Sequence, residues 1–253
     1  MESNYKWYDF DKSLDRLDEI LNSASSFEDK DEIPKRTDLT YTNGYYVKCS
    51  ALFVDLRDSS KMPELHQKRV LAKIYRSYIS EIVAILNGYS ICKEINIIGD
   101  CVSAIFKAKY TSEIDEAFAA AFRINTIIQI LNYKLEKKGY SPIKAGIGMS
   151  FGRVLMIQAG YSGSTINDVV WMGEAVNQAS KMCSKASKDI SSPIVVTPDF
   201  YSNLNDHNQG LLSESGYYES PKYYHGSVVD TVMYEWLKKK KEKDLEKQNT
   251  KWW

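Results

Sequence analysis

The most regular hydrophobic pattern in this chain lies between residues 143 and 150. Every second residue is apolar, and the intervening positions hold a lysine, two glycines and a serine. A period of two predicts a β-strand whose successive side chains point to opposite faces. Because Gly146 and Gly148 leave one face of this strand almost bare, we expect another group to approach that face closely.

A strand-helix pattern precedes this segment by about a hundred positions. Residues 45–55 form an apolar run that ends in an acid and predicts a first strand. Pro63 then precedes a long stretch of apolar residues at helical spacing, which closes at Asn87-Gly88. Proline near a helix start and glycine just past its end are typical helix boundaries.

A predicted hairpin follows this helix. Residues 90–108 read as two strands folded back on each other across a Gly99-Asp100 tip. After it, Ser112 and Asp115 resemble a helix-capping pair, and helical spacing continues to Gly139. The predicted order of elements up to this point is β-α-β-β-α.

The carboxyl-terminal part predicts shorter elements. Strands are expected at residues 153–160, 168–172, 193–197 and 228–237. Helices are expected at residues 174–186, after Gly173, and from Pro198-Asp199 onward. Residues 205–227 are polar and rich in turn formers, and residues 238–253 form a charged tail whose lysines we interpret as a solvated run.

The amino-terminal segment has a different character. Residues 5–22 place apolar side chains at spacings of three and four between charged residues, which predicts an amphipathic helix. Two interpretations remain open for its apolar stripe, namely packing on the domain's own surface or pairing with a partner chain. Residues 23–43 are polar and contain a proline, and we interpret them as a linker.

Composition excludes several classes of protein. With 253 residues and 33 basic against 33 acidic side chains, the chain predicts one large domain with appendages and no nucleic-acid binding. Its four cysteines lack metal-ligand spacing and are expected to be thiols in a reducing compartment. No apolar signal core opens the sequence, and no stretch reaches the roughly 18 apolar residues that span a bilayer. We therefore expect a cytoplasmic protein without stable membrane contact.

Two acids at strand ends are the first candidates for chemistry. Asp55 ends the first strand and Asp100 lies at the hairpin tip, so the fold can present them side by side. Paired carboxylates suit Mg²⁺ or Mn²⁺, which prefer oxygen ligands. Gly-Asp is also an ordinary hairpin turn, and taken alone it is more often structural. The histidines at positions 66, 207 and 225 are isolated and do not predict a catalytic pair.

Four pieces in this order carry a resemblance to a known family. They are Asp55, Gly99-Asp100, the stretch Gly148-Met-Ser-Phe-Gly152, and the stretch from Val170 to Lys181. Together, over roughly residues 45–200, they resemble the catalytic domain of class III nucleotidyl cyclases. The resemblance implies an α+β, ferredoxin-like βαββαβ domain with a mixed antiparallel sheet and helices on one face. We place this domain at residues 45–237, between an amino-terminal region (1–44) and the tail (238–253).

The resemblance also implies a two-metal reaction. In that family the metal site, here Asp55, Leu56 and Asp100, binds two Mg²⁺ or Mn²⁺ ions, and the ribose 3′-oxygen of a nucleoside triphosphate attacks the α-phosphorus as pyrophosphate leaves. Asn177 corresponds to the asparagine that orients the ribose. Lys181 stands where the family usually has an arginine that stabilises the transition-state phosphate. Each site is expected at a homodimer interface, shared between two chains.

The base-reading positions depart from the purine pattern. Asn96 replaces the usual lysine or glutamate, and Val170 replaces a polar selector. An asparagine amide both donates and accepts, so it suits the edge of uracil or of cytosine. In the loop after Asp55, Arg57 and Ser59 are expected to contact the nucleotide, although the family commonly has glycine and phenylalanine in this loop.

These departures are similar to the bacterial pyrimidine cyclases of Pycsar anti-phage defence. That similarity implies a substrate of UTP, in preference to CTP, and a cyclic UMP product that acts on a separate cyclic-nucleotide-sensing effector. An adenylate or guanylate cyclase is an alternative. A degenerate nucleotide-binding dimerisation domain is the alternative that is not an enzyme. A palm-fold diguanylate cyclase is a further rival, but the chain lacks its Gly-Gly-acid-acid-Phe run.

Overall fold

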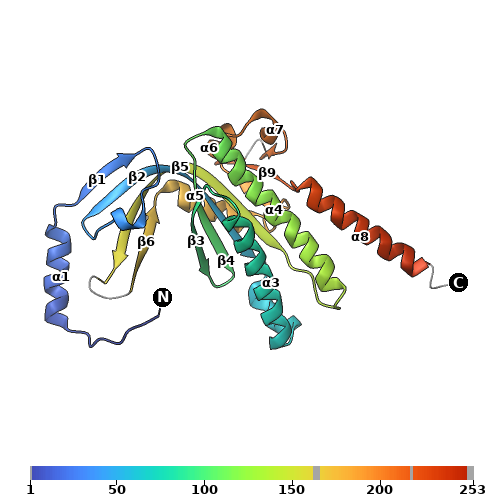
Figure 1. The fold of residues 1–253 in the computed structure, drawn as a ribbon, viewed down its shortest axis with the longest axis horizontal. Coiled ribbons are helices and arrows are strands. Elements are labelled where there is room, and N and C mark those ends of the chain that lie inside the picture. The colour runs from blue at the N-terminus through green and yellow to red at the C-terminus, as the bar shows by residue number, and fades with distance from the viewer. Residues whose placement is uncertain (1, 162–165, 217–218, 250–253) are drawn as a thin grey trace.

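The centre of the fold is the long strand β2 (Asn43–Leu56). It pairs antiparallel with β4 (Cys101–Lys107) on one side and with β5 (Ala145–Gly160) on the other. The computed structural model describes residues 2–161, 166–216 and 219–249 (Figure 1). Its sheet has the order β3-β4-β2-β5-β7-β9-β8, with β1 added on β2 and β6 on β5. Both parallel and antiparallel pairs occur, so the sheet is mixed, as expected.

The bounds of the remaining elements are as follows. The other strands are β1 (Ser26–Lys30), β3 (Cys92–Ile98), β6 (Asn167–Met172), β7 (Ile194–Val196), β8 (Ser213–Glu214) and β9 (Tyr224–Gly226). The helices are α1 (Phe10–Asn22), α2 (Met62–Leu65), α3 (Lys68–Asn87), α4 (Thr111–Glu136), α5 (Glu174–Lys185), α6 (Pro198–Ser202), α7 (Asp206–Gln209) and α8 (Thr231–Asn249). The predicted β-α-β-β-α order is confirmed.

Helices cover both faces of the sheet. The main core lies between the sheet and the helices α3 and α4, and β2 contributes Leu52 and Val54 to it, both fully buried (Figure 1). The alternate residues of β2 point to the opposite face, where Ala51 packs with Ala175 and Ala179 of α5. The α+β class is therefore confirmed. We expected helices on one face of the sheet. Helices α3 and α4 lie there, and α5 in addition covers the opposite face.

The bare face of β5 is where α5 packs. A side chain at Gly148 would meet the backbone nitrogen of Cys183 and the carbonyl oxygen of Ala179, both in α5. The group that approaches this strand face is thus a helix backbone of the same chain. The two predicted strands at 143–149 and 153–160 are one continuous strand, because β5 stays in register with β2 along its whole paired length.

Two predictions near the helices are wrong. Asp115 does not pair with Ser112 to cap α4; Glu113 accepts from the backbone nitrogens of Lys109 and Tyr110, and Asp115 instead accepts from Asn205. The strand expected at 228–237 is the start of α8. There the Asp230 carboxylate accepts from the backbone nitrogen of Met233, which satisfies a free donor at the helix start.

Helix α8 runs through the predicted boundary at residue 237. Leu237 is buried, and farther along the helix Asp244 accepts a hydrogen bond from the Tyr133 hydroxyl of α4. The charged run 238–241 thus belongs to a helix that docks on α4, although residues 250–253 of the tail lie outside the described part of the chain. The domain limits at 45 and 237 stay predictions.

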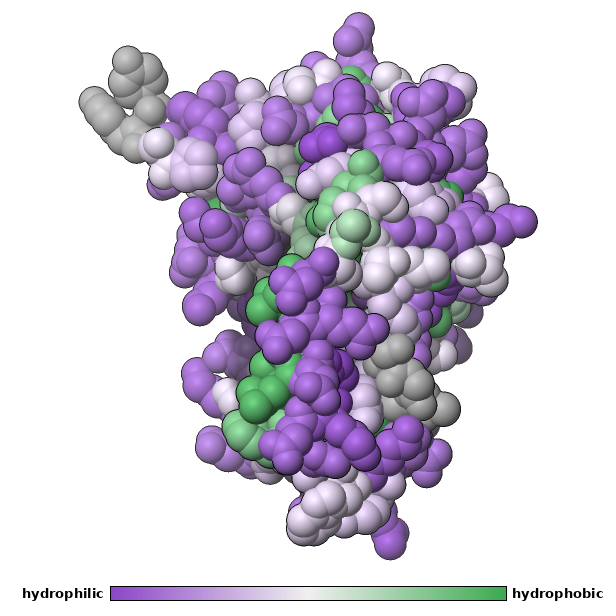
Figure 2. Space-filling view, turned by 90° about the vertical axis from the view of Figure 1, so that its left-hand side faces the viewer, coloured by the Kyte–Doolittle hydropathy of each residue, from purple (hydrophilic) through white to green (hydrophobic). Residues whose placement is uncertain are grey.

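The amino-terminal region contains more structure than a linker. Helix α1 begins at Phe10, five positions after the predicted start, because Asp9 caps it by accepting from the backbone nitrogen of Lys12. Strand β1 lies within the predicted linker and pairs parallel with β2. Helix α1 buries none of its residues, so among the described residues its apolar stripe does not pack into the domain. Figure 2 shows apolar side chains exposed beside polar ones on this side of the molecule.

Candidate active site

Asp55 and Asp100 meet at one end of the sheet, as predicted. Asp55 is the penultimate residue of β2, and Asp100 follows Gly99, whose φ of +64° allows the tight turn between β3 and β4. The pKa of the Asp55 carboxyl is raised, first by burial and then by the negative charge of Asp100, whereas Arg57 opposes this rise. The two carboxylates are therefore close enough to repel each other.

The donor set at this end fits a hard cation. The Oδ2 atom of Asp100 is buried and has no hydrogen-bond partner within the described residues. A buried carboxylate oxygen without a partner is costly, and a divalent cation or its bound water would satisfy it. Two carboxylates suffice for Mg²⁺, which takes its remaining ligands from water and phosphates. The side chain of Leu56 is buried in the core, so only its backbone carbonyl can serve as a ligand.

The side chain of Arg57 is bound by other residues of the same chain. Its side chain is only 9% exposed and makes an ion pair of 3.1 Å with the Asp55 Oδ2 atom. Its Nε donates to the carbonyl oxygen of Ala186 at 2.8 Å, and its Nη2 donates to the carbonyl oxygen of Cys183. Ser59 opens the short 3₁₀ turn that follows Asp58. Arg57, which we expected to contact the nucleotide, therefore points toward α5.

Asn96 and Val170 lie on two strands that Arg36 links. Arg36 ion-pairs with Glu94 of β3 and, at 3.0 Å, with Asp168 of β6. Glu94 and Asp168 stand two residues before the two predicted base-reading positions, so one guanidinium ties the strands that carry them. The sequence analysis missed Arg36 and Glu94 because they lie 58 positions apart and share no local motif.

Asn177 and Lys181 lie on the outer side of α5. The inner side of this helix is formed by buried residues such as Ala179 and Cys183, which face the sheet. Asn177 and Lys181 are exposed, and within residues 2–161, 166–216 and 219–249 no hydrogen bond or ion pair joins either to Asp55 or Asp100. Within one chain, the described structure therefore joins these two residues to neither aspartate by a polar contact.

Comparison with known proteins decides the family. The family described as "Adenylate and Guanylate cyclase catalytic domain" matches residues 42–222. The chain belongs to this cyclase family. It is 42% identical to a protein of Gulbenkiania mobilis named uridylate cyclase, over 95% of this chain and all of that one. It is 37% identical to a uridylate cyclase of Treponema porcinum, over 92% of this chain and 82% of that one. The chain is thus a nucleotidyl cyclase.

Solved structures support the fold of this cyclase. A bacterial light-regulated adenylyl cyclase superposes with a TM-score of 0.62 at 21% identity, covering 74% of this chain. The cyclase spans about half the length of that protein, at 54%. Among the described helices, none has a stretch both long and apolar enough to cross a bilayer.

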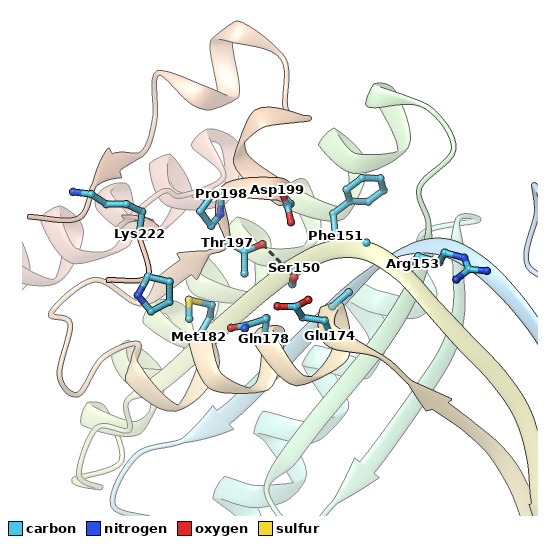
Figure 3. A pocket seen from close by; sticks show the side chains of 13 residues that line it. Ser150, Phe151, Arg153, Glu174, Gln178, Met182, Thr197, Pro198, Asp199 and Lys222 are labelled. Atoms are coloured by element: carbon cyan, nitrogen blue, oxygen red, sulfur yellow. Dashed lines mark hydrogen bonds between the residues drawn. The ribbon is translucent and has the colours of Figure 1, made fainter. Parts of the chain in front are cut away.

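A cavity of about 360 Å³ lies elsewhere in the cyclase (Figure 3). It is bounded by β5, α5 and the segment that begins at Thr197, whose hydroxyl donates to Ser150 at 3.1 Å. Glu174, Gln178 and Met182 face it from one stripe of α5, and neither Asp55 nor Asp100 lines it. The cavity therefore does not coincide with the expected metal site at Asp55 and Asp100.

Proposed function

We propose that this cyclase converts UTP to 3′,5′-cyclic UMP and pyrophosphate. The observation that carries the proposal is the 42% identity, over 95% of this chain, to a protein named uridylate cyclase. The absence of a purine-type selector at Asn96 and Val170 agrees with a pyrimidine substrate. Cytidylate cyclisation is the second candidate, since the same amide can meet cytosine in its flipped orientation.

The metal site would be formed by Asp55, Asp100 and the backbone carbonyl of Leu56. Two divalent ions, Mg²⁺ or Mn²⁺, would supply Lewis-acid activation of the 3′-hydroxyl and charge compensation on the triphosphate. The paired carboxylates support this assignment, as does the Asp100 oxygen that has no hydrogen-bond partner in the part of the chain that the structure describes. Two carboxylates that repel each other in the free protein are stabilised by any cation placed between them.

The remaining roles belong to side chains of the protein. The Asn96 amide would read the base edge beside Val170, and the Ser59 hydroxyl would donate to the triphosphate. Asn177 would hold the ribose, so that its 3′-oxygen lies in line with the bond to pyrophosphate. The Lys181 ammonium would offset the charge that builds on the α-phosphate, as a point charge in place of a planar fork.

The reaction is tested with UTP labelled at the α-phosphate and Mn²⁺. The expected products are one cyclic UMP and one pyrophosphate for each UTP consumed, identified by mass, and the Asp55→Ala variant forms neither. A linear dinucleotide or free UMP in place of a cyclic product would contradict cyclisation. If folded protein binds UTP and turns none over under any metal, the chain is a nucleotide-binding domain instead.

We further infer that two chains share each site. The support is that Asn177 and Lys181 face away from the sheet that carries Asp55 and Asp100. In a two-fold dimer, each α5 can face the metal half of the partner, which makes two identical composite sites. A homodimer in sedimentation, strengthened by a non-cyclisable UTP analogue, is the expected assembly. An active monomer would overturn this inference.

The same inference predicts complementation between inactive variants. Asp55→Ala and Lys181→Ala should each be nearly inactive, because every site in either homodimer lacks one required group. When the two are mixed, half of the dimers become heterodimers with one intact site, so activity should recover to about a quarter of wild type. If subunits exchange and the mixture stays inactive, Asp55 and Lys181 do not meet across chains.

The cyclic product would act in the cytoplasm on a separate effector that senses cyclic nucleotides, in anti-phage defence. Similarity to the pyrimidine cyclases of that defence supports this role. Cells that carry the enzyme together with an effector that responds to cyclic UMP should resist phage infection, and cells with the Asp55→Ala variant and the same effector should not. Equal resistance in both kinds of cell would show that the cyclic product is not needed for defence.

A further inference from the structure

Arg57 joins the metal-binding strand to the end of α5. Its guanidinium uses all three of its nitrogens: Nη1 for Asp55, Nε for the carbonyl oxygen of Ala186, and Nη2 for the carbonyl oxygen of Cys183. The two carbonyls lie at the carboxyl-terminal end of α5, where backbone acceptors lack the regular helical donor four residues on, although the Cys183 carbonyl also accepts from the Ala186 backbone nitrogen at 3.2 Å. A charged donor is favourable there, since it also matches the negative end of the helix dipole.

The neighbouring strand leaves room for this guanidinium. Gly146 of β5 stands directly opposite Asp55 in the pairing of β2 with β5. A side chain at Gly146 would collide with the Arg57 Nη2 atom and with the carbonyl oxygen of Ala186. The glycine is therefore required by the same set of contacts, and it offers a second way to disturb them without changing Arg57.

We propose that Arg57 is a positioning residue that holds the Asp55 carboxylate and α5 as one rigid unit. It fixes which Asp55 oxygen faces outward, because Oδ2 is engaged with its Nη1 atom. It also sets the place of the helix that carries Asn177 and Lys181. The proposal rests on the proposed cyclase function with shared sites. In that dimer, Arg57 links the metal half of one site to the catalytic helix of the other.

This role differs from binding of the triphosphate by Arg57. A phosphate ligand would add to substrate binding, so its loss would raise KM. A positioning residue leaves the substrate contacts in place and misaligns the reacting groups, so its loss lowers kcat. Loss of Arg57 should therefore change mainly KM if it binds phosphate, and mainly kcat if it positions the reacting groups.

The test compares Arg57→Met with Lys61→Met, which removes an exposed cation from the same loop, where Lys61 pairs with Asp58. Backbone hydrogen exchange of nucleotide-free protein is the first readout. In Arg57→Met the amides around 183–188 should exchange about tenfold faster, because two carbonyl acceptors lose a charged donor. The turnover of UTP is the second: kcat should fall about tenfold or more, and KM should change less than about threefold. Lys61→Met should match wild type in both.

Gly146→Ala and Arg57→Lys keep the test decisive if Arg57→Met fails to fold. Both should show the same pattern, because the first displaces the guanidinium and the second can reach only one acceptor at a time. A higher KM for UTP with unchanged kcat would overturn the proposal in favour of a phosphate contact. Unchanged exchange at 183–188 together with unchanged kcat would overturn it altogether.

The link between the two sites is tested in mixed dimers. In the mixture of Asp55→Ala and Lys181→Ala chains, the working site takes its α5 from the Asp55→Ala chain. Adding Arg57→Met to that chain reaches the working site only through α5, and should lower cyclic UMP formation about tenfold. Unchanged output would overturn the α5 part of the proposal. If the parent mixture is itself inactive, shared sites fail, while the exchange result still decides whether Arg57 positions α5.

Discussion

The close contact between α5 and β5 predicts a large cost for one added methyl group. In Gly148→Ala, the new Cβ would lie 2.6 Å from the Cα atom of Cys183 and closer still to two other backbone atoms of α5. Backbone cannot rotate away as a side chain can, so the helix must move outward. Overpacking of this kind costs about 2–3 kcal/mol, after subtracting the small gain from a stiffer unfolded chain. For a chain of this size, the midpoint of thermal unfolding should fall by roughly 5–10 °C.

Gly152→Ala is the matched control for this prediction. Gly152 lies on the same face of β5, but a Cβ there meets only the Cβ of Ala175, at 3.3 Å. Its unfolding midpoint should therefore stay within about 2 °C of wild type. Differential scanning calorimetry of both variants checks the pair. If Gly148→Ala melts as Gly152→Ala does, α5 does not pack against β5 as described, and the position of Asn177 must be reconsidered.

The remaining predictions concern the metal site and the base. Asp55→Ala and Asp100→Ala should abolish cyclisation while the protein stays folded at the assay temperature, since each removes a metal ligand; near wild-type turnover in either would refute the metal assignment. Asn96→Ala should weaken discrimination among the four nucleotides more than it weakens triphosphate binding, measured as separate kcat/KM values. Unchanged discrimination would show that another residue reads the base. Arg36→Met should destabilise the fold by about 1–3 kcal/mol in urea, because the buried Glu94 carboxylate loses its charged donor. An unchanged urea midpoint would mean that this ion pair does not stabilise the fold.

The parts of the fold that the sequence predicted well depend on local pattern. Alternation at 143–150 and the Gly99-Asp100 turn identify β5 and the hairpin from neighbouring residues alone. The stretch 228–237 failed because its two adjacent valines favour a strand, while the capping contact of Asp230 and the docking of Leu237 depend on α8 as a whole. Tertiary packing decided that segment, as it often does for short apolar runs.

The same distinction applies to the site. Asp55 and Asp100 were predictable because each ends a strand or marks a turn, and the sheet then brings them together. The roles of Arg57 and Arg36 were not predictable, because each depends on a distant partner. Cys183 lies 126 positions after Arg57, and Glu94 lies 58 positions after Arg36. An arginine carries no local signal of the acceptor it will find. These long-range contacts therefore emerge only from the folded chain.

The substrate is tested most directly by one competition measurement. Purified enzyme with Mn²⁺ is given ATP, GTP, CTP and UTP together at equal concentrations, and the cyclic products are separated and identified by mass. Cyclic UMP should be the dominant product, with cyclic CMP next and purine cyclic nucleotides least, and the Asp100→Ala variant should form none. Dominant cyclic AMP or cyclic GMP would contradict the account, because it would mean that Asn96 and Val170 accept a purine.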